Sequence, residues 1–160
     1  MRIATKSSKL NISKLENTKK IADIFAKNIF KGNIILFYGE IGVGKTTFIK
    51  FLVNSLEKID KKNISEITSP TFSLMNQYKL NKFDIHHYDL YRLKSEKDIL
   101  SLNIFEDISD KIVLIEWPEI LGEHKPRNTI DINFEYGENF NSRYLTISAC
   151  LLYTSPSPRD

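Results

Sequence analysis

The residues most able to do chemistry form one short glycine-rich segment. Residues 39–46, GEIGVGKT, match the pattern G-x-x-x-x-G-K-[ST]. In this pattern the glycines let the backbone wrap around a phosphate, and amides at the start of the following helix point at it. Lys45 would reach the β- and γ-phosphates, Thr46 would offer its hydroxyl to Mg²⁺, and Thr47 would lie near the α-phosphate. The predicted nucleotide-binding residues of this segment are Gly39, Glu40, Ile41, Gly42, Val43, Gly44, Lys45, Thr46 and Thr47.

The segments on either side favour a phosphate-binding loop over a chance glycine-rich turn. Residues 33–38, NIILFY, are a continuous apolar run of strand length, which is typical of a strand covered on both faces. Residues 48–59 follow with apolar side chains at helical spacing. The order strand, loop, helix is the context that the pattern requires. The loop alone does not choose between ATP and GTP, or between hydrolysis and phosphoryl transfer.

Two acidic residues are candidates for holding the metal or positioning water. Glu116 ends the buried run 112–115, where ligands of open α/β sheets collect. It would contact the metal through water or orient the nucleophile, although a solvent-facing acid at a strand end is also common. Asp89 lies among aromatic and apolar residues, where an unpaired charge is costly, so Mg²⁺ or Arg92 is expected beside it. The predicted catalytic residues are Lys45, Asp89 and Glu116, and the predicted metal ligands are Thr46, Asp89 and Glu116.

Three further sequence patterns are weaker evidence for function. Ser69, Pro70 and Thr71 follow the loop helix, where nucleotide-sensing switch segments often lie, although a capped turn before a strand explains them nearly as well. His86 and His87 have no further ligands at transition-metal spacing, which favours ordinary strand histidines. Residues 81–84 spell NKxD, the guanine-reading pattern of GTPases, but precede the Glu116 strand, so we interpret them as a chance match.

A capping box predicts the first helix. Ser13 has Glu16 three residues on, and Gly32 supplies a left-handed stop. The apolar face expected for this helix consists of Ile21, Ile24, Phe25 and Ile29.

Periodicity assigns the other elements. We expect a short edge strand before Ser13, a strand pair over 67–80 and 83–93, and a helix from Ser95 to about Leu102. Alternation predicts a terminal hairpin over 129–136 and 143–149. The predicted fold is a three-layer α/β/α domain with a mixed, mostly parallel sheet.

Composition limits the class of protein. The chain has 160 residues and a net charge of +3, too small to make nucleic acid the default partner, and no apolar run of membrane-spanning length. A single cysteine excludes an intramolecular disulfide and fits a reducing, cytoplasmic setting. We expect one domain over 1–149. Residues 150–160, with two Ser-Pro steps and no segment left to pair with, are expected to lie outside it and to derive from readthrough or cloning.

Four motifs in order, GEIGVGKTT, SPTFSL, HYDLYRL and IEWPE, closely resemble the TsaE (YjeE) family of small bacterial ATPases over about residues 10–149. The resemblance implies that residues 39–46 bind ATP, that Ser69 to Thr71 act as a switch, and that Asp89 and Glu116 serve the magnesium site. It also implies that Trp117 lies at the nucleotide, where residue type alone favours a core aromatic. The tail after Ala149 departs from the family pattern, which leaves contacts of a C-terminal extension open.

The same resemblance implies a role in making threonylcarbamoyladenosine beside the tRNA anticodon. Members of the family work with TsaD, which carries the transferase site, and TsaB, and ATP hydrolysis is thought to reset that complex. We therefore expect tRNA contact through the partners, no membrane or DNA partner, and slow hydrolysis alone, because no arginine lies in the loop region. Arg92 or a partner's arginine would supply the missing charge. The alternatives are a small-molecule kinase and a nucleotide-dependent binding module without hydrolysis.

Overall fold

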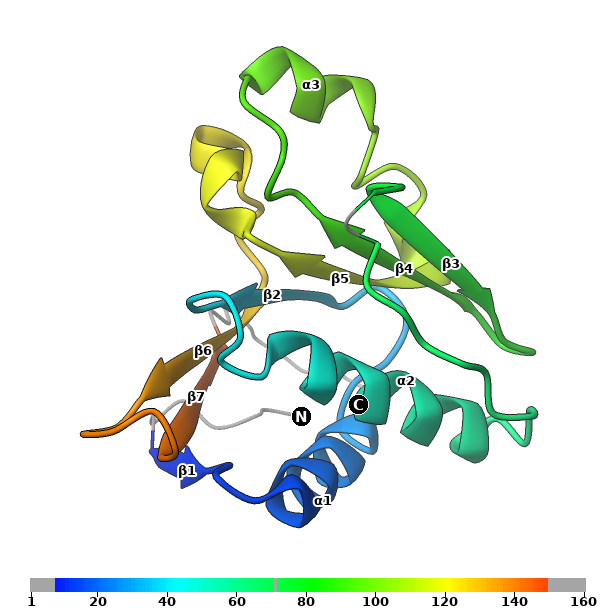
Figure 1. Ribbon diagram of the computed structural model, residues 1–160. Coiled ribbons are helices and arrows are strands. Elements are labelled where there is room, and N and C mark those ends of the chain that lie inside the picture. The colour runs from blue at the N-terminus through cyan, green and yellow to red at the C-terminus, as the bar shows by residue number, and fades with distance from the viewer. Residues whose placement is uncertain (1–7, 71, 150–160) are drawn as a thin grey trace.

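One mixed sheet of seven strands organises the described part of the chain, residues 8–70 and 72–149 of a computed structural model (Figure 1). The strand order is β1-β7-β6-β2-β5-β4-β3. The strands are β1 (Lys9–Asn11), β2 (Ile34–Tyr38), β3 (Met75–Lys79), β4 (Asp84–Asp89), β5 (Lys111–Glu116), β6 (Ile130–Tyr136) and β7 (Arg143–Ala149).

The centre of the sheet is parallel and its edges are antiparallel. Strand β2 pairs in parallel with β5 and β6, and β5 also pairs in parallel with β4. The pairs β3–β4, β6–β7 and β1–β7 are antiparallel. Parallel strands that are covered on both faces need apolar side chains in both directions, as the buried runs of β2 and β5 have. The predicted mixed α/β architecture is therefore confirmed.

Helices cover both faces of this sheet. Helices α1 (Leu15–Ala26) and α2 (Lys45–Ile59) pack side by side on one face (Figure 1). Helix α3 (Glu96–Ser101) and the 3₁₀ segments η1 (Ile108–Asp110) and η2 (Pro118–His124) belong to the other side. Two separate apolar clusters result, one on each face of the sheet. This is the predicted three-layer arrangement.

The capping box predicted for the first helix is wrong. Lys14 occupies the N-cap, and its side chain makes no capping hydrogen bond. The hydroxyl of Ser13 instead accepts a hydrogen bond of 3.0 Å from the Arg143 amide, so it ties the start of α1 to β7. A tertiary partner outweighs the local one here, because the edge strand β1 brings Ser13 against β7.

The predicted end and face of α1 also need correction. The helix ends at Ala26 rather than at Gly32, and the side-chain amide of Asn28 donates to the Ile24 carbonyl at 2.8 Å. Of the predicted face, Phe25 and Ile29 are buried in the core and Ile21 packs partly against it, whereas Ile24 is 57% exposed and does not belong to the core. The buried residues of α1 are Thr18, Ala22, Phe25 and Ala26.

The remaining predicted elements are confirmed. The edge strand, the second strand of the pair (β4), the buried strand β5 and the hairpin β6–β7 occur within a few residues of the expected positions. The first strand of the pair is shorter than predicted, because β3 begins at Met75 rather than at residue 67. Ser95 caps α3 by accepting a hydrogen bond of 3.2 Å from the Asp98 amide. The separation of residues 1–149 as one domain stays a prediction, because residues 150–160 lie outside the described residues.

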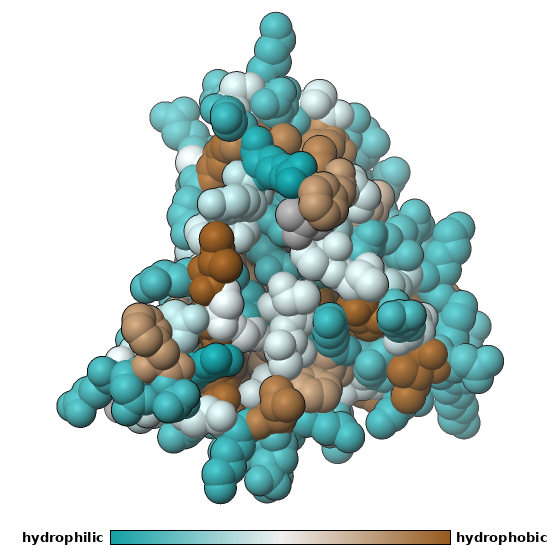
Figure 2. Space-filling view, in the orientation of Figure 1, coloured by the Kyte–Doolittle hydropathy of each residue, from teal (hydrophilic) through white to brown (hydrophobic). Residues whose placement is uncertain are grey.

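The outer surface is mostly polar on the face that Figure 2 shows, with hydrophobic side chains in small separate groups. Among the described residues, no helix is long and apolar enough to cross a membrane.

A cluster of four phenylalanine rings packs the start of α2 against the sheet and α1. Phe48 lies in the first turn of α2 and contacts rings from three other elements: Phe25 at 6.0 Å, Phe37 at 6.1 Å and Phe134 at 5.9 Å between centroids. All four rings are buried. The cluster thereby fixes the start of α2 on β2, β6 and α1 at once.

The substitution Phe48→Ala is expected to lower the free energy of unfolding by about 3–5 kcal/mol, because it removes a fully buried ring and leaves a cavity. Urea denaturation measures this loss. The control Phe72→Ala removes a ring that is 84% exposed and should change stability by less than about 0.5 kcal/mol. Equal losses in the two variants would contradict the role of the cluster.

Candidate functional site

The glycine-rich segment forms the connection between β2 and α2. Gly39 follows β2 with φ +146°, and a side chain there would come within 2.9 Å of the Phe134 carbonyl oxygen. Gly44 precedes α2 with φ +117°, a conformation that other residues rarely adopt. The loop can therefore wrap tightly only with glycines at these two positions.

Neighbouring side chains hold this loop from both sides. The hydroxyl of Tyr136, at the end of β6, donates to the Ile41 carbonyl at 3.3 Å. Val43 is fully buried in the core and anchors the middle of the loop. The ammonium of Lys45 donates to the Gly39 carbonyl, so the lysine lies across the loop it follows. The loop is thus preorganised, with a cation at its centre.

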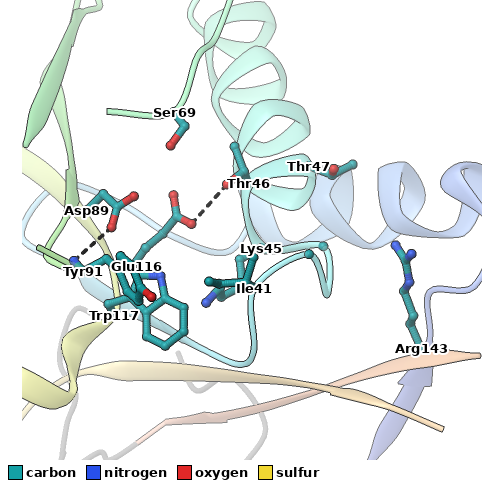
Figure 3. A pocket seen from close by; sticks show the side chains of 12 residues that line it. Ile41, Lys45, Thr46, Thr47, Ser69, Asp89, Tyr91, Glu116, Trp117 and Arg143 are labelled. Atoms are coloured by element: carbon teal, nitrogen blue, oxygen red, sulfur yellow. Dashed lines mark hydrogen bonds between the residues drawn. The ribbon is translucent and has the colours of Figure 1, made fainter. Parts of the chain in front are cut away.

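Glu116 joins the loop helix to the end of β5. Its Oε1 accepts a hydrogen bond of 3.1 Å from the Thr46 hydroxyl (Figure 3). Its Oε2 lies 2.8 Å from Nε2 of His87, on β4. The side chain is only 4% exposed, so these contacts replace most of the water that a carboxylate needs. The predicted acid therefore meets the predicted metal-binding hydroxyl.

Asp89 lies beside Glu116 because their strands are paired in register. Its Oδ1 accepts a hydrogen bond of 3.1 Å from the Tyr91 amide (Figure 3). The Leu90 amide donates to the Glu116 carbonyl at 3.1 Å and continues the pairing past the strand ends. Two carboxylates from adjacent strands thus end at one edge of the sheet. Arg92, the alternative partner of Asp89, stacks over the ring of Phe72 at 4.5 Å.

Trp117 turns sharply after β5. Its backbone is left-handed, with φ 58° and ψ 53°, an uncommon conformation for a residue with a side chain. The indole lies against Tyr91, with centroids 4.8 Å apart, and the Lys45 ammonium lies 3.7 Å from its ring centroid. This turn brings the tryptophan to the lysine of the loop.

These side chains surround one cavity of about 340 Å³. Ser69 enters it from the segment after α2, and Arg143 lines it from the start of β7 (Figure 3). The lining residues are Ile41, Gly42, Gly44, Lys45, Thr46, Thr47, Ser69, Asp89, Tyr91, Glu116, Trp117 and Arg143. The structure therefore brings together most of the predicted site residues, and adds Tyr91 and Arg143.

Some predicted residues do not line this cavity. Gly39 and Val43 support the loop from beneath, and Glu40 forms part of its exposed turn. Pro70 is buried, and its carbonyl accepts a hydrogen bond of 2.8 Å from the Leu74 amide. Thr71 lies outside the described residues.

The NKxD segment has a structural role. The backbone amide of Asn81 donates to the Asp60 carboxylate, and its side-chain amide donates to the Asp60 carbonyl at 3.0 Å. Asn81 therefore joins the end of α2 to the turn between β3 and β4, in keeping with a chance match to the guanine-reading pattern.

Burial lowers the pKa of the Lys45 ammonium, and the nearby carboxylates of Glu116, Glu119 and Asp89 offset this effect in part. Burial removes part of the water that would stabilise the ammonium, so binding of an anion such as a phosphate next to Lys45 is favoured.

The oxygen donors of the site suit Mg²⁺. The Thr46 hydroxyl and the Glu116 carboxylate are hard oxygen ligands only 3.1 Å apart, and Asp89 adds another carboxylate to the same cavity. Within residues 8–70 and 72–149, no three Asp, Glu, His or Cys side chains gather as a ready-made metal site. Mg²⁺ usually takes one or two carboxylates together with water and substrate phosphates.

Sequence reasoning missed three residues of this site. Arg143 carries no motif signal, because only the register of the hairpin brings it to the cavity. Tyr91 belongs to the HYDLYRL motif, but only the turn after β4 brings its side chain to the cavity. Strand alternation does place His87 on the same face of β4 as Asp89, and that signal was available. It did not reveal that Glu116 of the next strand would lie within hydrogen-bond distance of the imidazole.

The sequence profile of the family described as "Threonylcarbamoyl adenosine biosynthesis protein TsaE" matches residues 12–145. The chain belongs to the TsaE family. Relatives named "tRNA threonylcarbamoyladenosine biosynthesis protein TsaE" include one from Rickettsia conorii, 38% identical over 132 residues that cover 82% of this chain and 73% of the relative. The Nostoc relative is 34% identical over 137 residues, which cover 82% of this chain and 80% of that protein. The recognition from four motifs is therefore confirmed.

A solved structure supports the fold independently. YdiB of Bacillus subtilis superimposes with a TM-score of 0.71 over 93% of this chain and 89% of that protein, at 23% identity. At this identity the likeness establishes the shared fold.

Trp117, the single tryptophan of the chain, provides a direct test of the site. A magnesium nucleotide that draws Lys45 away from the indole is expected to change the tryptophan fluorescence in a saturable way, because the cation lies 3.7 Å from the ring. Lys45→Ala should abolish the titration. A saturable change of equal size and midpoint in that variant would contradict the assigned site.

Proposed function

We propose that this TsaE-family chain binds Mg-ATP and hydrolyses it in the service of tRNA threonylcarbamoyladenosine synthesis. Its partners in this proposal are the TsaD and TsaB proteins, and tRNA is reached through that complex. The names of the relatives support the pathway, and the arrangement of the site supports the nucleotide chemistry.

The observation that carries the proposal is the hydrogen bond between Thr46 and Glu116. It links the phosphate-binding loop to a carboxylate on a different strand, which a glycine-rich turn without function would not need. In the proposed site, the loop amides and Lys45 bind the phosphates. Thr46, Asp89 and Glu116 hold Mg²⁺, which neutralises phosphate charge when bound. Glu116 also orients the attacking water.

Hydrolysis by the isolated chain is proposed to be slow. The cationic side chains of the described cavity lining are Lys45 and Arg143, and Arg143 enters from the β7 side, where Thr47 lies (Figure 3). Arg92 is engaged with Phe72. The negative charge that develops at the γ-phosphate is therefore only partly neutralised by this chain. In other phosphate-hydrolysing enzymes an arginine from a partner protein supplies the missing positive charge. Turnover in the complex would then reset TsaD–TsaB for another round.

The structure offers little support for the kinase alternative. Small-molecule kinases of this architecture close a lid over an acceptor pocket, whereas residues 72–110 hold β3, β4, the six-residue α3 and η1. Within these described residues no helical lid faces the cavity. Hydrolysis therefore remains the reaction that we propose.

The test is ATP turnover by the full chain with Mg²⁺, alone and with TsaD and TsaB from the same source. Slow release of phosphate that rises on addition of the pair is expected, because the complex would supply the missing positive charge. Nucleotide that is bound but not hydrolysed, even with both partners, would contradict the proposal and indicate a binding module.

Glu116→Gln is expected to lower turnover roughly 100-fold while nucleotide binding stays within about threefold, because the amide keeps the shape but cannot take up a proton. Lys45→Ala is expected to weaken binding itself. Single-turnover assays and equilibrium titrations separate the two effects. The matched control Glu123→Gln changes an exposed acid outside the cavity and should behave as wild type. Equal turnover in Glu116→Gln and Glu123→Gln would refute the assignment of Glu116.

A further inference from the structure

We propose that His87 is a positioning residue that holds the Glu116 carboxylate in its working orientation. This inference rests on the proposed function, because it assigns a task to a side chain next to the proposed reaction site. His87 is fully buried and lies on β4, two residues before Asp89. Its Nε2 lies 2.8 Å from Oε2 of Glu116.

The contact between His87 and Glu116 lies on a face of the sheet that is otherwise apolar. On β4 the residues that share this face are Ile85, His87 and Asp89, and on β5 they are Ile112, Leu114 and Glu116. Ile85, Ile112 and Leu114 belong to the apolar cluster beneath α1 and α2. Polar groups begin only where the strands approach the loop. The imidazole therefore lies at the boundary between the core and the site.

The direction of the hydrogen bond follows from the chemistry of the pair. An ionised carboxylate can only accept hydrogen bonds, so the imidazole nitrogen that faces it must carry a proton. Nδ1, on the other side of the ring, has no hydrogen-bond partner among the described residues. The contact with Glu116 is thus the one polar contact that the described structure gives this ring.

The two oxygens of Glu116 are held by different parts of the molecule. Thr46 binds Oε1 from the start of α2, and His87 binds Oε2 from the centre of the sheet. Two contacts on opposite oxygens fix the plane of a carboxylate, which one contact cannot do. A fixed plane keeps Oε1 directed toward the cavity, where metal and water are proposed to lie. Loss of a side chain that orients a metal ligand, the role proposed for Glu116, typically lowers metal affinity or activity 10- to 100-fold.

Two substitutions that both fill the buried space test this proposal. His87→Gln keeps an N–H donor about as far along the side chain as Nε2, whereas His87→Leu keeps the bulk and loses the donor. Turnover of His87→Leu is expected to fall about 10- to 100-fold with nucleotide binding within about threefold, and His87→Gln should retain most of the wild-type turnover. In the Glu116→Gln background, His87→Leu should cause no further loss, because the two residues act as a unit.

His86→Gln is the matched control. His86 lies on the opposite face of β4, next to Tyr88, and does not line the cavity. The variant is expected to turn over ATP as the wild type does. Equal losses in His87→Gln and His87→Leu, or a further loss in the double variant, would overturn the positioning role and leave His87 as a core residue.

A second measurement is independent of turnover. Proton–nitrogen NMR of the histidine side chains is expected to show a slowly exchanging Nε2-bound proton for His87 that shifts in Glu116→Gln and not in Glu123→Gln. An Nε2 proton that is absent, or indifferent to Glu116→Gln, would overturn the inference. If the wild type shows this proton but hydrolyses no ATP with its partners, the proposed function fails while the contact stands.

Discussion

The parallel pairing of β2, β5 and β4 is the constraint on which the rest of the site depends. Register aligns Phe37 of β2 with Glu116 of β5, and Glu116 with Asp89 of β4. All three strands therefore end at the same edge of the sheet, and the loop after β2 meets both carboxylates there. A shift of β5 by one residue would turn Glu116 to the opposite face and remove it from Thr46. The apolar side chains that fix this register thus also fix the chemistry.

Side chains packed beneath the phosphate-binding loop hold it rigidly at the strand ends. Phe48 ties the first turn of α2 to three neighbouring elements, while Tyr136 and Val43 hold the loop itself. The loop backbone and the Glu116 carboxylate are consequently held in place by the fold itself. Preorganised charge of this kind needs little rearrangement during a reaction, which is why it is effective in phosphoryl chemistry.

Much of the fold and the site could be predicted from the sequence because the signals are local. The strand-loop-helix order around residues 39–46 and the caps and alternation of later segments depend only on near neighbours. The capping box at Ser13 failed because its hydroxyl found a partner on β7, 130 residues away. The places of Arg143 and of the His87–Glu116 contact follow from strand order and register, which the chain specifies only through long-range packing.

The central claim is that the loop, Thr46 and the two carboxylates form one magnesium-nucleotide site. A crystal structure of the chain with Mg²⁺ and a non-hydrolysable ATP analogue tests it most directly. The account predicts that Lys45 leaves the Gly39 carbonyl for the phosphates and that the metal lies at Thr46, with Glu116 still on His87. Phosphates bound outside the loop, or a metal remote from Thr46 and both carboxylates, would contradict the account.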